Sequence, residues 1–154
     1  MIEDAMNETK QTLELLLFRI GAQEYCVDIQ EVREIRGWAV ATPLPQAPAY
    51  VRGVVNLRGA VLPIVDLADR LGFGAAEPNV RSAIIVVEAG AALVGLLVDE
   101  VSEILSASPD ALRPTPPVCE DGRSFVKGIL VVEDRLVSWI VLENVLPQDL
   151  AEAA

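Results

Sequence analysis

The sequence predicts a mainly β protein made of two copies of one small β-rich unit. Valine, isoleucine and leucine occur in runs of about five to eight residues that Gly, Pro, Asp or Asn interrupts, which is typical of many short strands. The chain also matches itself at offsets of 69 and 75 residues. Its 154 residues fit one domain, or two small units sharing a core, and 52% of them are apolar, which excludes a disordered acidic chain despite the net charge of −11.

The first half of the chain contains two predicted hairpins with a proline-spaced loop between them. Apolar runs flank the turn at residues 21–23 and the break Arg58-Gly59. Three prolines keep the loop Thr42–Pro48 extended and exposed, because proline lacks a backbone donor and stiffens the chain. The predicted elements are strands at 13–20, 24–28, 54–57 and 60–65, a short helix or strand at 29–35, and a helical turn at 67–71.

The second half repeats this order. A long loop at residues 106–122 holds four of the ten prolines and separates two hairpins. The predicted elements are strands at 82–88, 92–98, 126–132 and 135–142, and a helical turn at 143–146. Residues 1–12 are expected to be flexible and residues 148–154 to fray, so a single folded domain is expected at 13–147.

Comparison of the two halves favours an internal duplication. Residues 15–36 align without a gap on 84–105, and both segments contain Gly-Ala followed by Glu-Val-x-Glu-Ile; residues 50–71 align in the same way on 125–146. Chance similarity between valine-rich strand pairs is the alternative, but it does not explain the shared order of elements. Each copy is too small for much of a core, so the copies are expected to pack together. The residues expected in the core include Leu16, Phe18, Val55, Ile64, Ile85, Val87, Leu130 and Ile140.

The composition excludes several classes of function. The chain has no histidine, which removes Ser-His and Cys-His nucleophile pairs and histidine metal sites. Cys26 and Cys119 lack a metal-binding spacing and are expected to be free thiols. No phosphate-binding glycine loop is present, and the acidic charge argues against nucleic acid. Neither a secretory signal nor an apolar stretch long enough to span a bilayer is found, so we expect a cytoplasmic protein without metal, cofactor or membrane insertion.

Two groups of charged residues are candidates for a function. Glu31 and Glu34 recur as Glu100 and Glu103, either as acid–base pairs or, more commonly for such a pattern, as solvated edges of strands. Arg58 follows a predicted strand in Asn56-Leu-Arg-Gly59. Its guanidinium is suited to anchoring a partner's carboxylate, and a turn arginine in water is the alternative.

The segment Pro48-Ala-Tyr-Val-Arg-Gly-Val-Val-Asn-Leu-Arg-Gly-Ala-Val-Leu-Pro-Ile-Val-Asp-Leu67 resembles the signature of the CheW family of bacterial chemotaxis coupling proteins. Residues 18–37, 98–102 and 129–142 fit the same family, so the resemblance extends from about residue 13 to residue 146. It implies two small five-stranded β-barrels packed side by side, with short helices and a shared apolar seam. It also implies a non-catalytic adaptor that links the cytoplasmic tips of chemoreceptors to the regulatory domain of the histidine kinase CheA and is recruited to membrane receptor arrays.

The resemblance also implies two sets of binding residues. The receptor-binding set is Val32, Glu34, Ile35, Asn56, Arg58 and Ile84. The kinase-binding set is Val40, Leu44, Arg52 and Gly53. Trp38 and the loop Thr42–Pro48 depart from the family pattern near the second set.

Two alternatives to a free-standing adaptor are the adaptor part of a CheV-like protein and an acidic β-barrel enzyme or ligand carrier. The former needs a receiver domain after Ala154, and the absence of histidine weakens the latter. A deep polar pocket would favour the latter.

Overall fold

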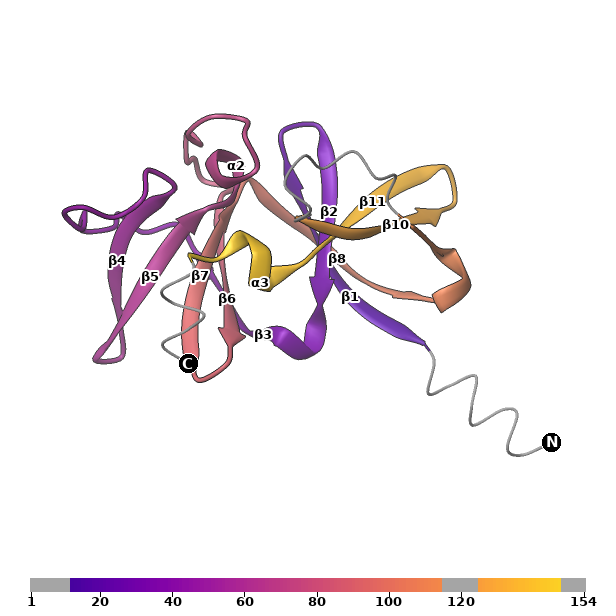
Figure 1. The fold of residues 1–154 in the computed structure, drawn as a ribbon, viewed down its shortest axis with the longest axis horizontal. Helices are drawn as coiled ribbons and strands as arrows, with labels where there is room; N and C mark the ends of the chain where they lie inside the picture. Colours follow the sequence, from indigo (N-terminus) through magenta and orange to yellow (C-terminus); the bar gives the residue numbers. More distant parts are fainter. Residues whose placement is uncertain (1–11, 115–124, 148–154) are drawn as a thin grey trace.

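The structure is a computed structural model that describes residues 12–114 and 125–147. Two curved β-sheets lie side by side along its long axis, with the short helices α2 (Leu67–Arg70) and α3 (Leu142–Val145) near the junction (Figure 1). The predicted flexible ends lie outside the described residues, except for Thr12. Cys119 and the second half of the predicted loop at 106–122 also lie outside them.

The strands form one six-stranded and one five-stranded sheet. The first has the spatial order β8 (Glu100–Ala107), β1 (Leu13–Ile20), β2 (Gln23–Asp28), β11 (Arg135–Ile140), β10 (Val126–Val132), β9 (Leu112–Arg113). The second has the order β3 (Val32–Gly37), β6 (Ala83–Ala89), β7 (Ala92–Val98), β5 (Ala60–Asp66), β4 (Val51–Leu57). The 3-10 turns η1 (Ile29–Glu31) and η2 (Pro109–Ala111) precede β3 and β9. The predicted mainly β class is confirmed, and β8 is a strand that the sequence analysis did not assign.

The two copies exchange strands. Offsets of 69 and 75 residues superpose β1, β2 and β3 on β6, β7 and β8, and β4, β5 and α2 on β10, β11 and α3. Each sheet combines the first hairpin of one copy with the third strand and second hairpin of the other. The register repeats as well: a bulge between Val51 and Gly53 recurs between Val126 and Gly128, and the parallel pair β5–β7 recurs as β11–β2. Neither copy therefore forms either sheet alone.

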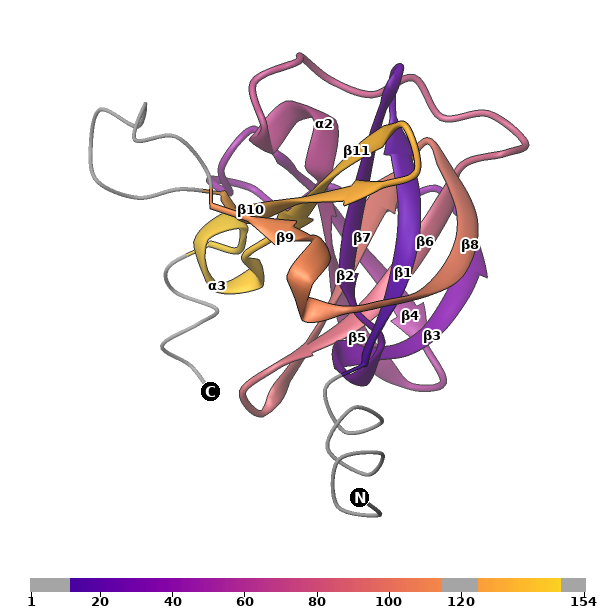
Figure 2. The same cartoon turned by 90° about the vertical axis from the view of Figure 1, so that its right-hand side faces the viewer.

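Each sheet closes towards a barrel through the chain that leaves its edge strand. In the second sheet, Thr42, which follows β3, forms a bridge to Val54 in β4 at the opposite edge. In the first sheet, the chain leaves β8, passes through η2 and pairs with β10 as β9 (Figure 2). The equivalent of the Thr42 bridge is thus a two-residue strand, which corrects the expected count of five strands to six in this sheet.

Strand alternation divides the core into three clusters. In β1, Leu15 and Leu17 face the interior of the first barrel, whereas Leu16 and Phe18 face the seam between the barrels. The seam cluster also contains residues of α2 and α3, which explains why these helices lie at the junction. The predicted core residues are buried, except for Val55, which is half-buried against the interior of the second barrel. Within the described residues, no helix is long and apolar enough to cross a membrane.

Candidate protein-binding surfaces

The turn between β4 and β5 presents Arg58 to solvent. The Asn56 side chain accepts a hydrogen bond from the Gly59 backbone N–H at 2.8 Å, which holds the turn closed. Arg58 has a φ of 51°, in the left-handed region, and its side chain is 69% exposed. Asn56 and Gly59 each support the turn: the Asn56 side chain bonds to the backbone, and Gly59 adopts a positive φ without a steric cost. The Arg58 side chain therefore projects from the tip of the turn.

Glu34 connects this turn to β3. Its carboxylate accepts hydrogen bonds from Arg58 and, at 3.3 Å, from Arg36. The hydrogen bond from Arg58 is the main cause that lowers the pKa of Glu34, and Glu34 in turn raises the pKa of Arg58. Because β3 and β4 are opposite edges of the sheet, the pair spans the opening of the barrel. An exposed pair adds little to stability, so its effect here is to orient Arg58 and keep its charge on this surface.

The apolar part of the predicted receptor set divides into exposed and buried positions. Ile35 is exposed on β3, and Val32 is half-buried at the seam. Ile84 is 1% exposed and points into the second barrel, so its side chain offers no surface for contact. It pairs in register with Arg36 and therefore supports β3 from the neighbouring strand.

Two exposed apolar residues were not among the predicted site residues, one beside this surface and one on the other sheet. Val61 is paired in register with Asn56 beside the Arg58 turn, and its side chain is largely exposed. Ile104 on β8 is the offset-69 equivalent of Ile35 and is exposed as well. The repeat pointed to Ile104. Val61 had no such signal, because an apolar run does not show which face of the strand is solvated.

A second surface surrounds the loop after β3. Val40 is 85% and Leu44 47% exposed, so the loop presents two apolar side chains to solvent within five residues of each other. Thr42 lies between them and exchanges two backbone hydrogen bonds of 2.8 Å with Val54. Gly53 makes this approach possible: its φ is 141°, and a Cβ at this position would lie 2.1 Å from the Thr42 carbonyl oxygen. Gly53 thus shapes the surface through the backbone rather than through a contact of its own.

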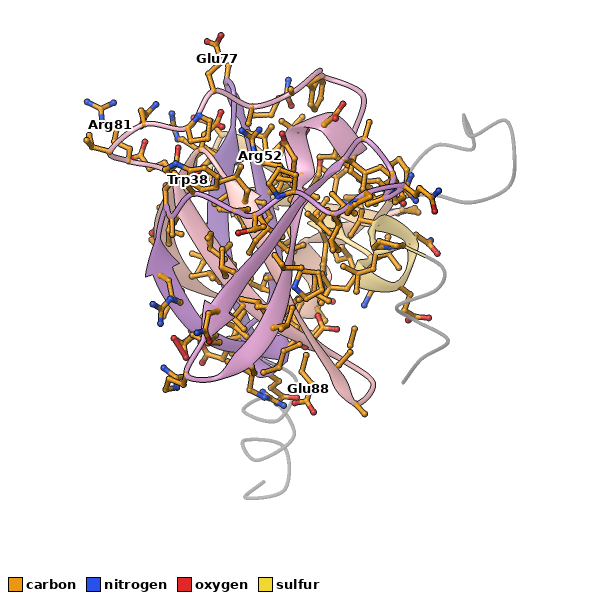
Figure 3. The ribbon with its side chains drawn as sticks, turned by 90° about the vertical axis from the view of Figure 1, so that its left-hand side faces the viewer. Trp38, Arg52, Glu77, Arg81 and Glu88 are labelled. Carbon is orange, nitrogen blue, oxygen red and sulfur yellow. The ribbon has the colours of Figure 1, made fainter. Side chains whose placement is uncertain are left out.

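Arg52 lies behind this loop rather than on its exposed side. Its Nη1 donates to Asp66 Oδ2 at 3.0 Å and to the Ala76 carbonyl at 3.1 Å, and the guanidinium lies over the Trp38 ring at 5.4 Å from its centroid (Figure 3). Asp66 is 1% exposed and also accepts hydrogen bonds from the backbone N–H groups of Ala76 and Asp69, the latter within α2. The family resemblance indicated Arg52 as a binding residue, but nothing in the sequence indicated this network.

Arg70 joins the two barrels at the junction. It donates to the carbonyls of Asn144 and Val145 at 2.9 and 2.8 Å, and its guanidinium lies 4.4 Å from the ring centroid of Tyr50 and 4.8 Å from that of Phe125. Tyr50 and Phe125 are equivalents at offset 75, so one cation contacts the same position of both copies. This contact links α2 to the end of α3 and was not foreseen from the sequence.

A hollow of about 620 Å³ bears on the ligand-carrier alternative. It is an open groove between the β1–β2 turn, α2 and the segment 73–81. Its described lining has no serine, threonine, cysteine or lysine, and Asp99 there accepts a hydrogen bond from the Gly21 N–H at 2.7 Å. The described residues also hold no group of three acidic, cysteine or histidine side chains that suits a metal. The groove is open to solvent and therefore differs from the deep polar pocket that would favour a ligand carrier.

The two surfaces lie on one barrel, both carry exposed apolar side chains, and both are candidates for binding a protein. Residues 14–149 match the family model described as a CheW-like domain, and the chain therefore belongs to the CheW family. Chemotaxis protein CheW of Rhizobium meliloti is 53% identical over the full length of both chains. Probable chemotaxis protein CheW of Rhizobium etli is 51% identical over 92% of each.

A solved structure agrees with this assignment. The crystal structure of the scaffolding protein TtCheW from Thermoanaerobacter tengcongensis has a TM-score of 0.78 and 32% identity, covering 84% of this chain and 88% of that one. Family, relatives and fold together identify a chemotaxis coupling adaptor, as the resemblance in the sequence implied.

Proposed function

We propose that the chain links the cytoplasmic tips of chemoreceptors to the regulatory domain of the histidine kinase CheA, in the cytoplasm and without turning over a substrate. The observation that carries this proposal is the presence of two distinct surfaces on the same barrel. One surrounds Arg58, Glu34 and Ile35, and the other surrounds Val40 and Leu44. A coupling protein needs two such surfaces, because it must hold both partners at once.

The Arg58 surface is proposed for the receptor. A receptor tip is helical, and an arginine fork beside exposed apolar side chains can bind the polar and apolar faces of a helix together. Val32, Ile35 and Asn56 complete this surface, with Ile84 supporting β3 from within. Glu34 orients the Arg58 guanidinium before the receptor binds, so less conformational entropy is lost on binding.

The Val40 and Leu44 surface is proposed for the kinase. Exposed apolar side chains on an ordered loop are typical anchors of an interface. Arg52 and Gly53 are assigned to this surface as residues that shape it: Arg52 lies behind the loop, and Gly53 brings Thr42 and its neighbours onto β4. Two binding sites, rather than one shared site, predict that the affinities respond independently to substitution.

Paired substitutions test the proposal. Arg58→Ala is expected to weaken binding of a purified receptor tip by roughly tenfold or more and to leave kinase-domain affinity unchanged. Leu44→Asp is expected to do the reverse, because a charge replaces an apolar anchor. Isothermal titration calorimetry measures both affinities, with the melting temperature as the control for folding. Loss of both affinities by one variant at unchanged melting temperature would contradict separate surfaces.

A further inference from the structure

We infer that Arg52 is a positioning residue of the kinase-binding surface, and that it orders this surface by tying Trp38 to the segment 73–80 instead of contacting the kinase. The inference rests on the proposed function, because it concerns how the proposed kinase surface is held in shape. From its charge alone, Arg52 would be expected to contact the kinase directly.

The donor groups of Arg52 are directed inwards. One Nη atom bridges the Asp66 carboxylate and the Ala76 carbonyl, and the Asp66 oxygen that receives it also accepts the Ala76 N–H at 2.9 Å. Ala76 is therefore held through both its N–H and its carbonyl. Its side chain packs at the edge of the seam and of the interior of the second barrel. The segment 73–80 is fixed at this point by Arg52 and Asp66 together.

The opposite side of the guanidinium supports the loop that carries the kinase anchors. Trp38 lies under Arg52 and packs against the interior of the second barrel, one residue after β3 ends. Val40 follows two residues later and Leu44 six residues later, with Thr42 fixed on β4 between them. The start of the loop is thus held by Trp38 and its middle by Thr42. Figure 3 shows Trp38 and Arg52 beside each other at the end of the barrel from which Glu77 and Arg81 project.

The burial of Asp66 makes this arrangement specific for arginine. A carboxylate that is 1% exposed needs its charge satisfied, and Arg52 supplies the cation. A lysine could pair with Asp66, but it has no planar group to lie over Trp38 while it also reaches the Ala76 carbonyl. Charge alone therefore does not replace Arg52.

The test compares Arg52→Gln and Arg52→Lys with Arg19→Gln, which removes an exposed arginine from β1 on the other barrel. Kinase-domain and receptor-tip affinities are measured by calorimetry. The Trp38 indole and Ala76 amide resonances are followed by NMR, with the indole assigned by Trp38→Phe. Both Arg52 variants are expected to shift these two resonances and to weaken kinase binding, Arg52→Gln by about tenfold, while receptor affinity and the Arg19→Gln control stay unchanged.

Two outcomes would overturn the inference. Weaker kinase binding with unmoved Trp38 and Ala76 resonances would make Arg52 a direct contact. Moved resonances with unchanged kinase affinity would show that this network does not shape the surface. Arg52→Lys keeps the charge beside Asp66, so it separates these results from simple unfolding. No binding of the kinase domain by the unsubstituted chain would instead contradict the proposed function itself.

Discussion

Gly53→Ala should destabilise the protein and remove kinase binding together, because one added methyl group collides with the loop that carries the kinase anchors. The new Cβ would lie 2.1 Å from the Thr42 carbonyl oxygen and 2.5 Å from its carbon, both of them backbone atoms. Relief requires Thr42 to withdraw until the contact exceeds 3.0 Å. That movement breaks the two Thr42–Val54 hydrogen bonds and displaces Val40 and Leu44.

The magnitude follows from these contacts. Each lost hydrogen bond contributes about 1 kcal/mol to the free energy of unfolding. The φ of 141° adds roughly 1–3 kcal/mol of backbone strain for a residue with a side chain. We expect a loss of about 3–5 kcal/mol in all, measured by urea denaturation, with kinase affinity measured in parallel.

Gly72→Ala is the matched control. Gly72 has a φ of 95°, and a Cβ there meets no atom within 4 Å, so the substitution introduces backbone strain without a collision. It should cost only roughly 1–3 kcal/mol of stability and leave kinase binding unchanged. Equal destabilisation by the two substitutions, or full kinase affinity for Gly53→Ala, would refute the role given to the contact between Gly53 and Thr42.

Three further predictions concern single side chains. Arg58→Lys keeps the charge but loses the planar guanidinium, so receptor affinity should fall while the melting temperature stays unchanged. Full receptor affinity in calorimetry would show that only the charge at this position contributes to binding. Val61→Ser should weaken receptor binding, because it removes an apolar side chain beside Asn56, whereas Leu136→Ser, at an exposed leucine on β11 in the other sheet, should not. Burial raises the pKa of the Cys26 thiol to about 12, so iodoacetamide at pH 8 should label Cys26 only after denaturation. Peptide mass spectrometry measures the labelling, and rapid labelling of Cys26 in the folded protein would contradict its burial. Because the pKa of the thiol is near 9.0 in the unfolded chain, Cys26 should also make the free energy of unfolding fall as pH rises above that value.

The sequence predicted the hairpins well because their apolar runs end at Gly, Pro, Asp or Asn. Strand boundaries such as 13–20, 92–98 and 126–132 match the structure. It could not predict the exchange of β3 and β8 between the sheets, because self-similarity shows that two segments are equivalent but not which copy each one pairs with. β8 was not predicted for a different reason: its acidic and polar residues leave only a weak strand pattern.

The binding surfaces were harder to predict than the strands. The turn around Arg58 follows from local sequence, since Asn56 and Gly59 shape it directly. Ile84 could not be assigned to a face, because β6 is apolar on both sides and alternation gives no sign of which side is solvated. The inward direction of Arg52 depends on Asp66 and Ala76, which only the tertiary fold brings beside it.

The central claim is that one chain holds both partners at once through separate surfaces. Analytical ultracentrifugation of the chain with a receptor tip and the kinase regulatory domain tests this most directly. A sedimenting species that contains all three proteins is predicted, whereas Arg58→Ala should leave only the complex of the chain with the kinase domain and Leu44→Asp only the complex with the receptor tip. Displacement of the receptor tip by the kinase domain, with no species containing all three, would contradict it.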